Sequence, residues 1–159
     1  MFTRKVIMWC LVAIWMGLIF YMSAMTGDES GAFSGRITGP IVRFIFKDFE
    51  SYSPDRQDEI MSTASLIVRK LAHFTEYFVL CFLVIHLLLC YNVNGLKLYM
   101  AAIIWSALYA ATDEYHQGFT AGRGPAVMDV LIDTSGAVVA ALFLGLIFLL
   151  KKRKTRHAV

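Results

Sequence analysis

The stretch RKLAHFTEY, residues Arg69–Tyr77, decides how the rest of the sequence is interpreted. It places two bases, an imidazole and an acid near the start of a strongly apolar run that extends from about residue 66 to residue 90. On an α-helix its polar side chains share one face, an arc of about 120° centred on His73. Because ionisable groups inside a membrane-spanning helix are costly unless they meet partners in the protein interior, the stretch indicates a functional site.

Apolar residues make up 58% of the 159 residues and are gathered into four runs. These lie at about 6–25, 66–90, 98–118 and 128–150. Each run is close to the length of about 20 residues that a helix needs to cross a bilayer. The predicted fold class is therefore all-α: a polytopic membrane protein with four transmembrane helices, forming one membrane domain over residues 1–159. The first run also resembles a signal peptide, but its length and aromatic residues favour a retained anchor.

Basic residues flank the apolar runs on one side of the predicted membrane. Arg4 and Lys5 precede the first run, Lys97 lies in the turn after the second, and a basic tail at 151–159 follows the last. The positive-inside rule then predicts that both termini are cytoplasmic. The net charge of +3 is not concentrated on a soluble basic face, so no nucleic-acid binding is expected.

The connection between the first two runs, residues 28–61, is predicted to lie outside. Residues 26–35 are rich in Gly, Ser and acids and favour a loop. Residues 37–49 alternate apolar and basic positions at helical spacing, which predicts a short extracytoplasmic interfacial helix or, as an open alternative, one that packs over the bundle. A further helix is expected to begin at Ser53-Pro54-Asp55. Whether it continues unbroken through residue 90 stays open.

The polar ends of the third and fourth runs are predicted to lie at the same depth as Arg69–Tyr77. Asp113 and Gln117 share one helix face, and Glu114 points about a quarter turn away. The Gly- and Pro-rich loop at 119–125 follows. The fourth run opens with two aspartates, and small residues after them predict close helix packing. The predicted ligand-binding residues are Arg69, Lys70, His73, Glu76, Asp113, Glu114, Gln117, Arg123, Asp129 and Asp133.

Three interpretations of this charged group remain open. The side chains can serve as ion pairs that fix helix packing, although buried ion pairs often cost as much as they return. Cations near the outer leaflet also suit the phosphate or carboxylate headgroup of an amphiphile. Alternatively, His73, Glu76, Asp113, His116 and Asp129 supply a metal site or an acid–base pair for hydrolysis. The His-x-x-Glu spacing is not that of a zinc protease, and neither a metal nor another cofactor is predicted.

Four motifs in this order resemble the VanZ-like family of bacterial membrane proteins. They are Arg69–Tyr77, TDEYHQGF at 112–119, Gly-Arg at 122–123, and Asp-Val at 129–130 with a following Gly136. The resemblance implies a small helical protein of the bacterial cell membrane, and the family's namesake is linked to low-level resistance to teicoplanin, a glycopeptide with an acyl tail. Residues 124–126 and 133–135 depart from the family pattern, in which an Asn is expected near Asp133.

Together these observations predict an outward-facing charged pocket that recognises the anionic headgroup of an envelope lipid or lipoglycopeptide and lowers susceptibility to teicoplanin-type antibiotics. The expected partners are membrane lipids and an anionic lipid-linked envelope precursor or lipoglycopeptide. Two alternatives are an intramembrane, metal-assisted hydrolase of a lipid-linked substrate and a structural partner of another membrane protein.

Overall fold

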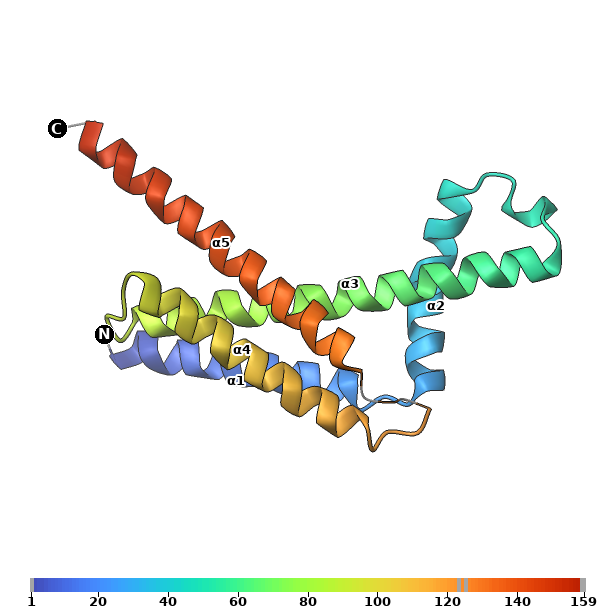
Figure 1. Cartoon of the computed structure of the whole chain (residues 1–159), viewed down its shortest axis with the longest axis horizontal. Coiled ribbons are helices and arrows are strands. Elements are labelled where there is room, and N and C mark those ends of the chain that lie inside the picture. Colours follow the sequence, from blue (N-terminus) through green and yellow to red (C-terminus); the bar gives the residue numbers. More distant parts are fainter. Residues whose placement is uncertain (1, 123, 125, 158–159) are drawn as a thin grey trace.

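The chain folds into helices joined by short connections, as the computed structural model in Figure 1 shows for residues 2–122, 124 and 126–157. No strand occurs within these residues. The elements are α1 (Phe2–Ser23), α2 (Gly27–Ile45), the 3₁₀ turn η1 (Phe49–Ser51), α3 (Pro54–Leu89), α4 (Leu96–Gln117) and α5 (Val127–His157). The all-α prediction is confirmed.

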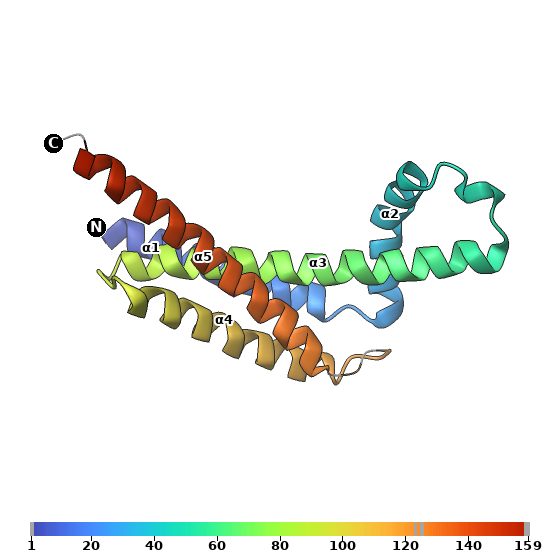
Figure 2. The same cartoon turned by 45° about the horizontal axis from the view of Figure 1, so that its top comes forward.

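Helix α3 is the axis of the molecule. Its 36 residues are continuous, which answers the question that the sequence left open. At 1.5 Å per residue they extend about 54 Å, well beyond a hydrocarbon core of about 30 Å. The second half of α3 packs with α1, α4 and α5, whereas the first half projects beyond them beside α2 (Figures 1 and 2). The helix begins at the expected Pro54, although the Ser53 side chain makes no capping hydrogen bond.

Helix α2 corrects the prediction of a loop at residues 26–35. It begins at Gly27 because Thr26 and Glu29 form a capping box. The Thr26 hydroxyl accepts from the Glu29 amide at 3.3 Å, and the Glu29 carboxylate accepts from the Thr26 amide at 2.9 Å. This reciprocal pair satisfies two amides that a helix start otherwise leaves without partners. The helix also ends earlier than expected, at Ile45.

Among the residues that the structure describes, three helices are long and apolar enough to cross a membrane: α1, α3 and α5 over Val127–Lys154. Helix α4, the fourth predicted span, is long enough at 22 residues but less apolar. The polar residues of α4 account for its lower apolarity, and four of them are buried: Ser106, Asp113, Glu114 and Gln117. These side chains face the other helices of the bundle.

Small residues let α5 approach α3 closely, as the sequence predicted. A Cβ added to Gly136 would overlap the carbonyl oxygen of Phe74, so the two backbones are in direct contact there. Ala137 and Ala140 are fully buried on the same side. Helices α3 and α5 consequently share the most extensive packing in the molecule. The core continues through Tyr77, Leu80 and other buried apolar residues of α3 and reaches α1 at Val12 and Ile19.

Candidate functional site

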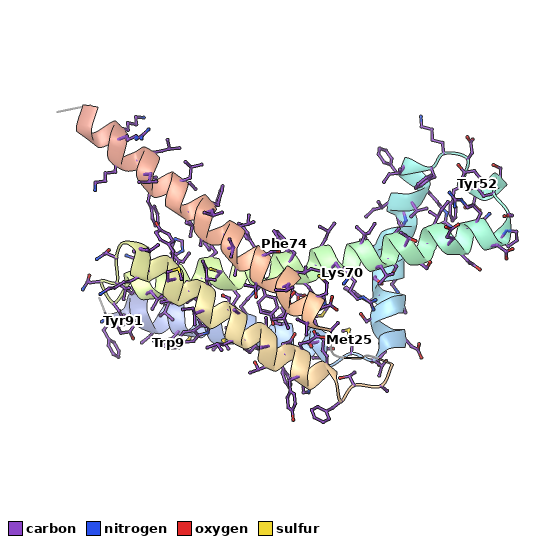
Figure 3. The ribbon with its side chains drawn as sticks, in the orientation of Figure 1. Trp9, Met25, Tyr52, Lys70, Phe74 and Tyr91 are labelled. Carbon is purple, nitrogen blue, oxygen red and sulfur yellow. The ribbon has the colours of Figure 1, made fainter. Side chains whose placement is uncertain are left out.

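Polar side chains from α3, α4 and α5 converge at one end of the bundle, where α1 and α4 end and α5 begins. Figure 3 places Lys70 beside the first turns of α5, with Met25 near the same end, while Trp9 and Tyr91 mark the opposite end. At that opposite end the Trp9 indole donates to the Tyr91 hydroxyl at 3.0 Å. The two ends therefore differ in chemistry: one carries clustered acids and bases from three helices, and the other an aromatic pair with the Lys5 ammonium 4.3 Å from the centroid of the Tyr91 ring.

The main ion pair of the site joins α3 to α5. The Lys70 ammonium donates to the Asp129 carboxylate at 2.5 Å, and the two side chains are 43% and 38% exposed. Since both remain partly in contact with solvent, screening limits the free energy that the pair contributes to folding. The Lys70 ammonium can therefore exchange part of its contact with Asp129 for a ligand.

His73 and Glu76 form a second polar pair one turn further along α3. The His73 Nδ1 and Glu76 Oε2 atoms are 3.6 Å apart, and the side chains are only 20% and 16% exposed. Their position is fixed from α1, because the Trp15 indole donates to the Glu76 backbone carbonyl at 2.9 Å. The pair thus belongs to the wall of the bundle.

Two cavities adjoin this part of α3. The polar one has a volume of about 190 Å³, and its lining includes Arg69, Lys70, His73, Gln117 and Asp129. The apolar one has a volume of about 70 Å³ and lies between α1, α2 and α3; its lining includes Met22, Met25, Phe33, Ile37, Val68 and Ala72. Arg69 and His73 line both cavities. The site therefore combines a charged compartment with an apolar one.

The ends of α4 and α5 bring further acids into the interior. Asp113 and Asp133 are 3% and 2% exposed. Gln117 donates to Asp113 at 3.3 Å, and Glu114 accepts from the backbone amide of Ala126 at 2.6 Å. Glu114, which was expected a quarter turn from the polar face, is buried because the chain leading into α5 closes over it.

The loop between α4 and α5 also meets the start of α2. The Gly27 amide donates to the Ala121 carbonyl at 3.1 Å, and a Cβ on Gly27 would overlap the Gly122 carbonyl oxygen. Gly122 adopts a positive φ of 74°, a conformation that favours glycine. This contact holds α2 against the loop that borders the polar cavity.

Nine of the ten predicted ligand-binding residues lie in the described part of the chain, and Arg123 lies outside it. The structure brings Lys70 to Asp129, His73 to Glu76, and Asp113 to Gln117. Within the described residues, no group of three or more His, Cys, Asp or Glu is arranged to hold a metal ion. His116, part of the hydrolase alternative, stacks instead on Phe20 with ring centroids 4.4 Å apart.

The sequence did not indicate the role of Ser23 or the existence of the apolar cavity. Ser23, at the end of α1, is 1% exposed and interacts with Asp113, but the first apolar run contained no sign of such a role. The apolar compartment was missed because α2 was expected to begin about ten residues later, which left Phe33 in a loop. Tyr77, in contrast, lay on the polar face that the sequence predicted, and it is fully buried against Asp113.

The model of the VanZ/LLP1 family matches residues 8–149, nearly the whole chain. The chain belongs to the VanZ/LLP1 family. This confirms the resemblance predicted from the four motifs. No curated protein and no solved structure matches this VanZ/LLP1 chain.

Proposed function

We propose that this VanZ/LLP1 protein binds an anionic amphiphile, with the headgroup in the polar cavity and the first methylene groups of the tail in the apolar one. The observation that carries the proposal is that Arg69 and His73 line both cavities. A ligand with a charged end and an apolar end matches this juxtaposition. The candidates are an anionic envelope lipid, a lipid-linked envelope precursor and a lipoglycopeptide of the teicoplanin type.

The charged groups support a phosphate or carboxylate headgroup. Arg69 offers a planar set of donors that matches such oxyanions, and Lys70 offers a compact charge. Asp129 orients Lys70 through the 2.5 Å contact. We assign Arg123 to the same group of cations from its place in the loop at 119–125. His73 adds a ring nitrogen that can form a hydrogen bond with the headgroup.

The proposed placement in the membrane follows from the arrangement of the helices. Helices α1, α3, α4 and α5 cross the bilayer of a bacterial cell, and α4 counts as the fourth span because its polar residues face inward. The start of α1 and the end of α5 lie at the same end of the bundle, as an even number of crossings requires (Figure 1). The basic tail then places this end in the cytoplasm and the charged site outside.

Helix α2 is proposed to lie along the outer interface. It runs crosswise to α3 (Figures 1 and 2) and exposes Phe33, Ile37, Ile41 and Phe44. Its other face contacts α3, where the Ser34 and Ser65 hydroxyls are 2.6 Å apart. An amphipathic helix in this position has its apolar face at the level of the lipid headgroups and upper acyl chains.

The proposal is tested by thermal unfolding of the purified protein in a neutral detergent. A single-chain phosphatidylglycerol should stabilise the wild type, and a single-chain phosphatidylcholine should not. Lys70→Ala should weaken the response about tenfold or more, because a charged hydrogen bond to an oxyanion is worth about 1.5–3 kcal/mol. Lys70→Arg should retain most of it, and Lys97→Ala, at the far end of the bundle, should leave it unchanged.

The biological arm uses teicoplanin susceptibility of a deletion strain that carries the same variants at equal expression. Lys70→Ala should make the strain more susceptible than Lys70→Arg does. If Lys70→Ala matched the wild type in both the lipid titration and the susceptibility test, headgroup binding at this cavity would be ruled out.

A further inference from the structure

A buried acidic centre lies beside the polar cavity, where α1, α3, α4 and α5 meet. We define it as Ser23, Tyr77, Asp113 and Asp133, whose exposed fractions are 1%, 0%, 3% and 2%. The Ser23 and Tyr77 hydroxyls interact with Asp113, whereas one buried oxygen of Asp133 makes no hydrogen bond to any described residue. Buried polar groups in proteins are nearly always satisfied, so this oxygen of Asp133 points to a ligand.

The charges around this centre are predominantly negative. Asp133 interacts with Asp113 and Glu114 of α4, with Glu76 of α3 and with Asp129 of α5, all of them acids. His116 acts on Asp113 in the opposite direction to the acids. Lys70 contacts Asp129, one turn before Asp133. Two carboxylates buried in this way require a compensating positive charge.

We propose that the acidic centre binds one small monovalent cation, either a proton or a sodium ion, between Asp113 and Asp133. A proton would be shared by the two carboxyls, as in other sites where like charges cannot both ionise. A sodium ion would use the same two carboxyl oxygens together with the hydroxyl oxygens of Ser23 and Tyr77. Hard cations prefer oxygen ligands of this kind.

The cation site does not depend on the headgroup proposal. Two residues that line the polar cavity also act on the acidic centre: Gln117 donates a hydrogen bond to Asp113, and Asp129 acts on Asp133 through its charge. Lys70 is not part of the centre, so loss of lipid binding in Lys70→Ala would leave the cation site intact. Conversely, the sodium response or the carboxyl band is expected whether or not the anionic lipid binds.

The test follows the thermal unfolding of the full-length protein in neutral detergent at fixed ionic strength. One series replaces choline chloride with sodium chloride. The other varies pH in choline chloride, with infrared spectroscopy of the carboxyl groups. For sodium at about 100 times its dissociation constant, the folded-to-unfolded ratio should rise about 100-fold. For a proton, sodium should have no effect, and a protonated-carboxyl band should disappear as the pH rises.

The sign of the pH effect follows from proton linkage. If the folded state holds a shared proton that the unfolded chain has lost, raising the pH removes that proton and lowers stability. Glu76, Glu114, His116 and Asp129 face the centre as well, so the assignment depends on variants. Asp133→Asn should abolish the sodium response or the infrared band, and Asp58→Asn, on the exposed part of α3, should change neither.

Two milder variants keep the test decisive if Asp133→Asn does not fold. Tyr77→Phe and Ser23→Ala each remove one hydroxyl oxygen. Either should weaken sodium binding several-fold, whereas both should leave a protonated-carboxyl band in place. If the wild type shows neither a sodium response that these variants weaken nor a titrating carboxyl band that Asp133→Asn removes, the inference is overturned.

Discussion

The two aspartates that open α5 lie one turn apart and meet opposite environments. Asp129 is 38% exposed and contacts a lysine, whereas Asp133 is 2% exposed and faces other acids. The first arrangement is a conventional partly exposed ion pair, which can form or break at little cost. The second is the arrangement for which we propose a bound proton or sodium ion. One turn of helix therefore separates a contact suited to exchanging partners from a buried acidic centre.

The largest expected effect comes from separating the helices that carry both regions. In Gly136→Ala, the new methyl group would overlap the Phe74 carbonyl oxygen and force α5 away from α3. We expect a loss of about 3 kcal/mol or more in unfolding free energy, since the clash is with backbone that cannot rotate away. Denaturant unfolding in detergent measures this loss.

Gly145→Ala is the matched control for this variant. Its Cβ would make ordinary contacts with the Tyr99 ring at 3.6 Å or more. Alanine inside a helix is favoured over glycine by about 0.5–1 kcal/mol, so this variant should be as stable as the wild type or slightly more. Equal stability of the two variants would contradict the close approach of α3 and α5.

Neutralising Asp129 and Asp133 one at a time tests whether the two aspartates have different environments. In choline chloride at alkaline pH, Asp133→Asn should be more stable than the wild type, by about 1–3 kcal/mol, because it relieves a buried group that lacks a partner. Asp129→Asn should be less stable by about 1 kcal/mol or less, because it removes the partner of Lys70. Thermal unfolding of both variants under identical conditions checks the opposite signs. Changes of the same sign would show that the two environments do not differ as described.

The smallest effect concerns the start of α2, where Gly27 contacts the loop that borders the polar cavity. Hydrogen bonds from the Thr26 amide and hydroxyl lower the pKa of Glu29 below its ordinary value of 4.5. The folded state therefore favours the charged carboxylate, and its stabilising contribution is present at neutral pH and lost as the pH falls through that lowered pKa. The protection of the first-turn amides of α2 against hydrogen exchange, relative to the intrinsic exchange rate at each pH, should therefore fall on acidification.

Glu29→Gln removes the titration but can still accept the same hydrogen bonds. The acid-dependent part of the exchange should disappear in this variant, and the two regions at α5 should be unaffected. An equal loss of protection on acidification in Glu29→Gln and the wild type would assign the pH effect to another group.

The sequence predicted the helices and the polar end of the bundle because both follow from periodicity and charge placement. The runs near 66–90, 98–118 and 128–150 correspond to α3, α4 and α5 with small differences at their ends. Gly136 and the alanines after it correctly indicated close packing. Local patterns failed at residues 26–35, where Gly and Ser suggested a loop but the capping pair of Thr26 and Glu29 initiates a helix.

The sequence could not predict which polar residues line the cavity and which are buried in the acidic centre. Asp129 and Asp133 occupy the same face at helical spacing, and only the distance to α3 and α4 decides which of them is buried. The contribution of Ser23 depends on where α1 ends relative to α4, which no local pattern encodes. Long-range packing thus separates one predicted polar surface into a cavity and a closed centre.

The length of α3 has a mechanical consequence. One helix carries the hydrophobic core at one end, Arg69 and His73 near its middle, and the connection to η1 and α2 at the other. A rod of about 54 Å without a break behaves as a lever, because helices of this length bend only gently in the absence of a kink. A sideways displacement of the projecting N-terminal end of α3 would therefore tilt the helix where it lines the cavity. The backbone contact between Phe74 and Gly136 would act as the pivot.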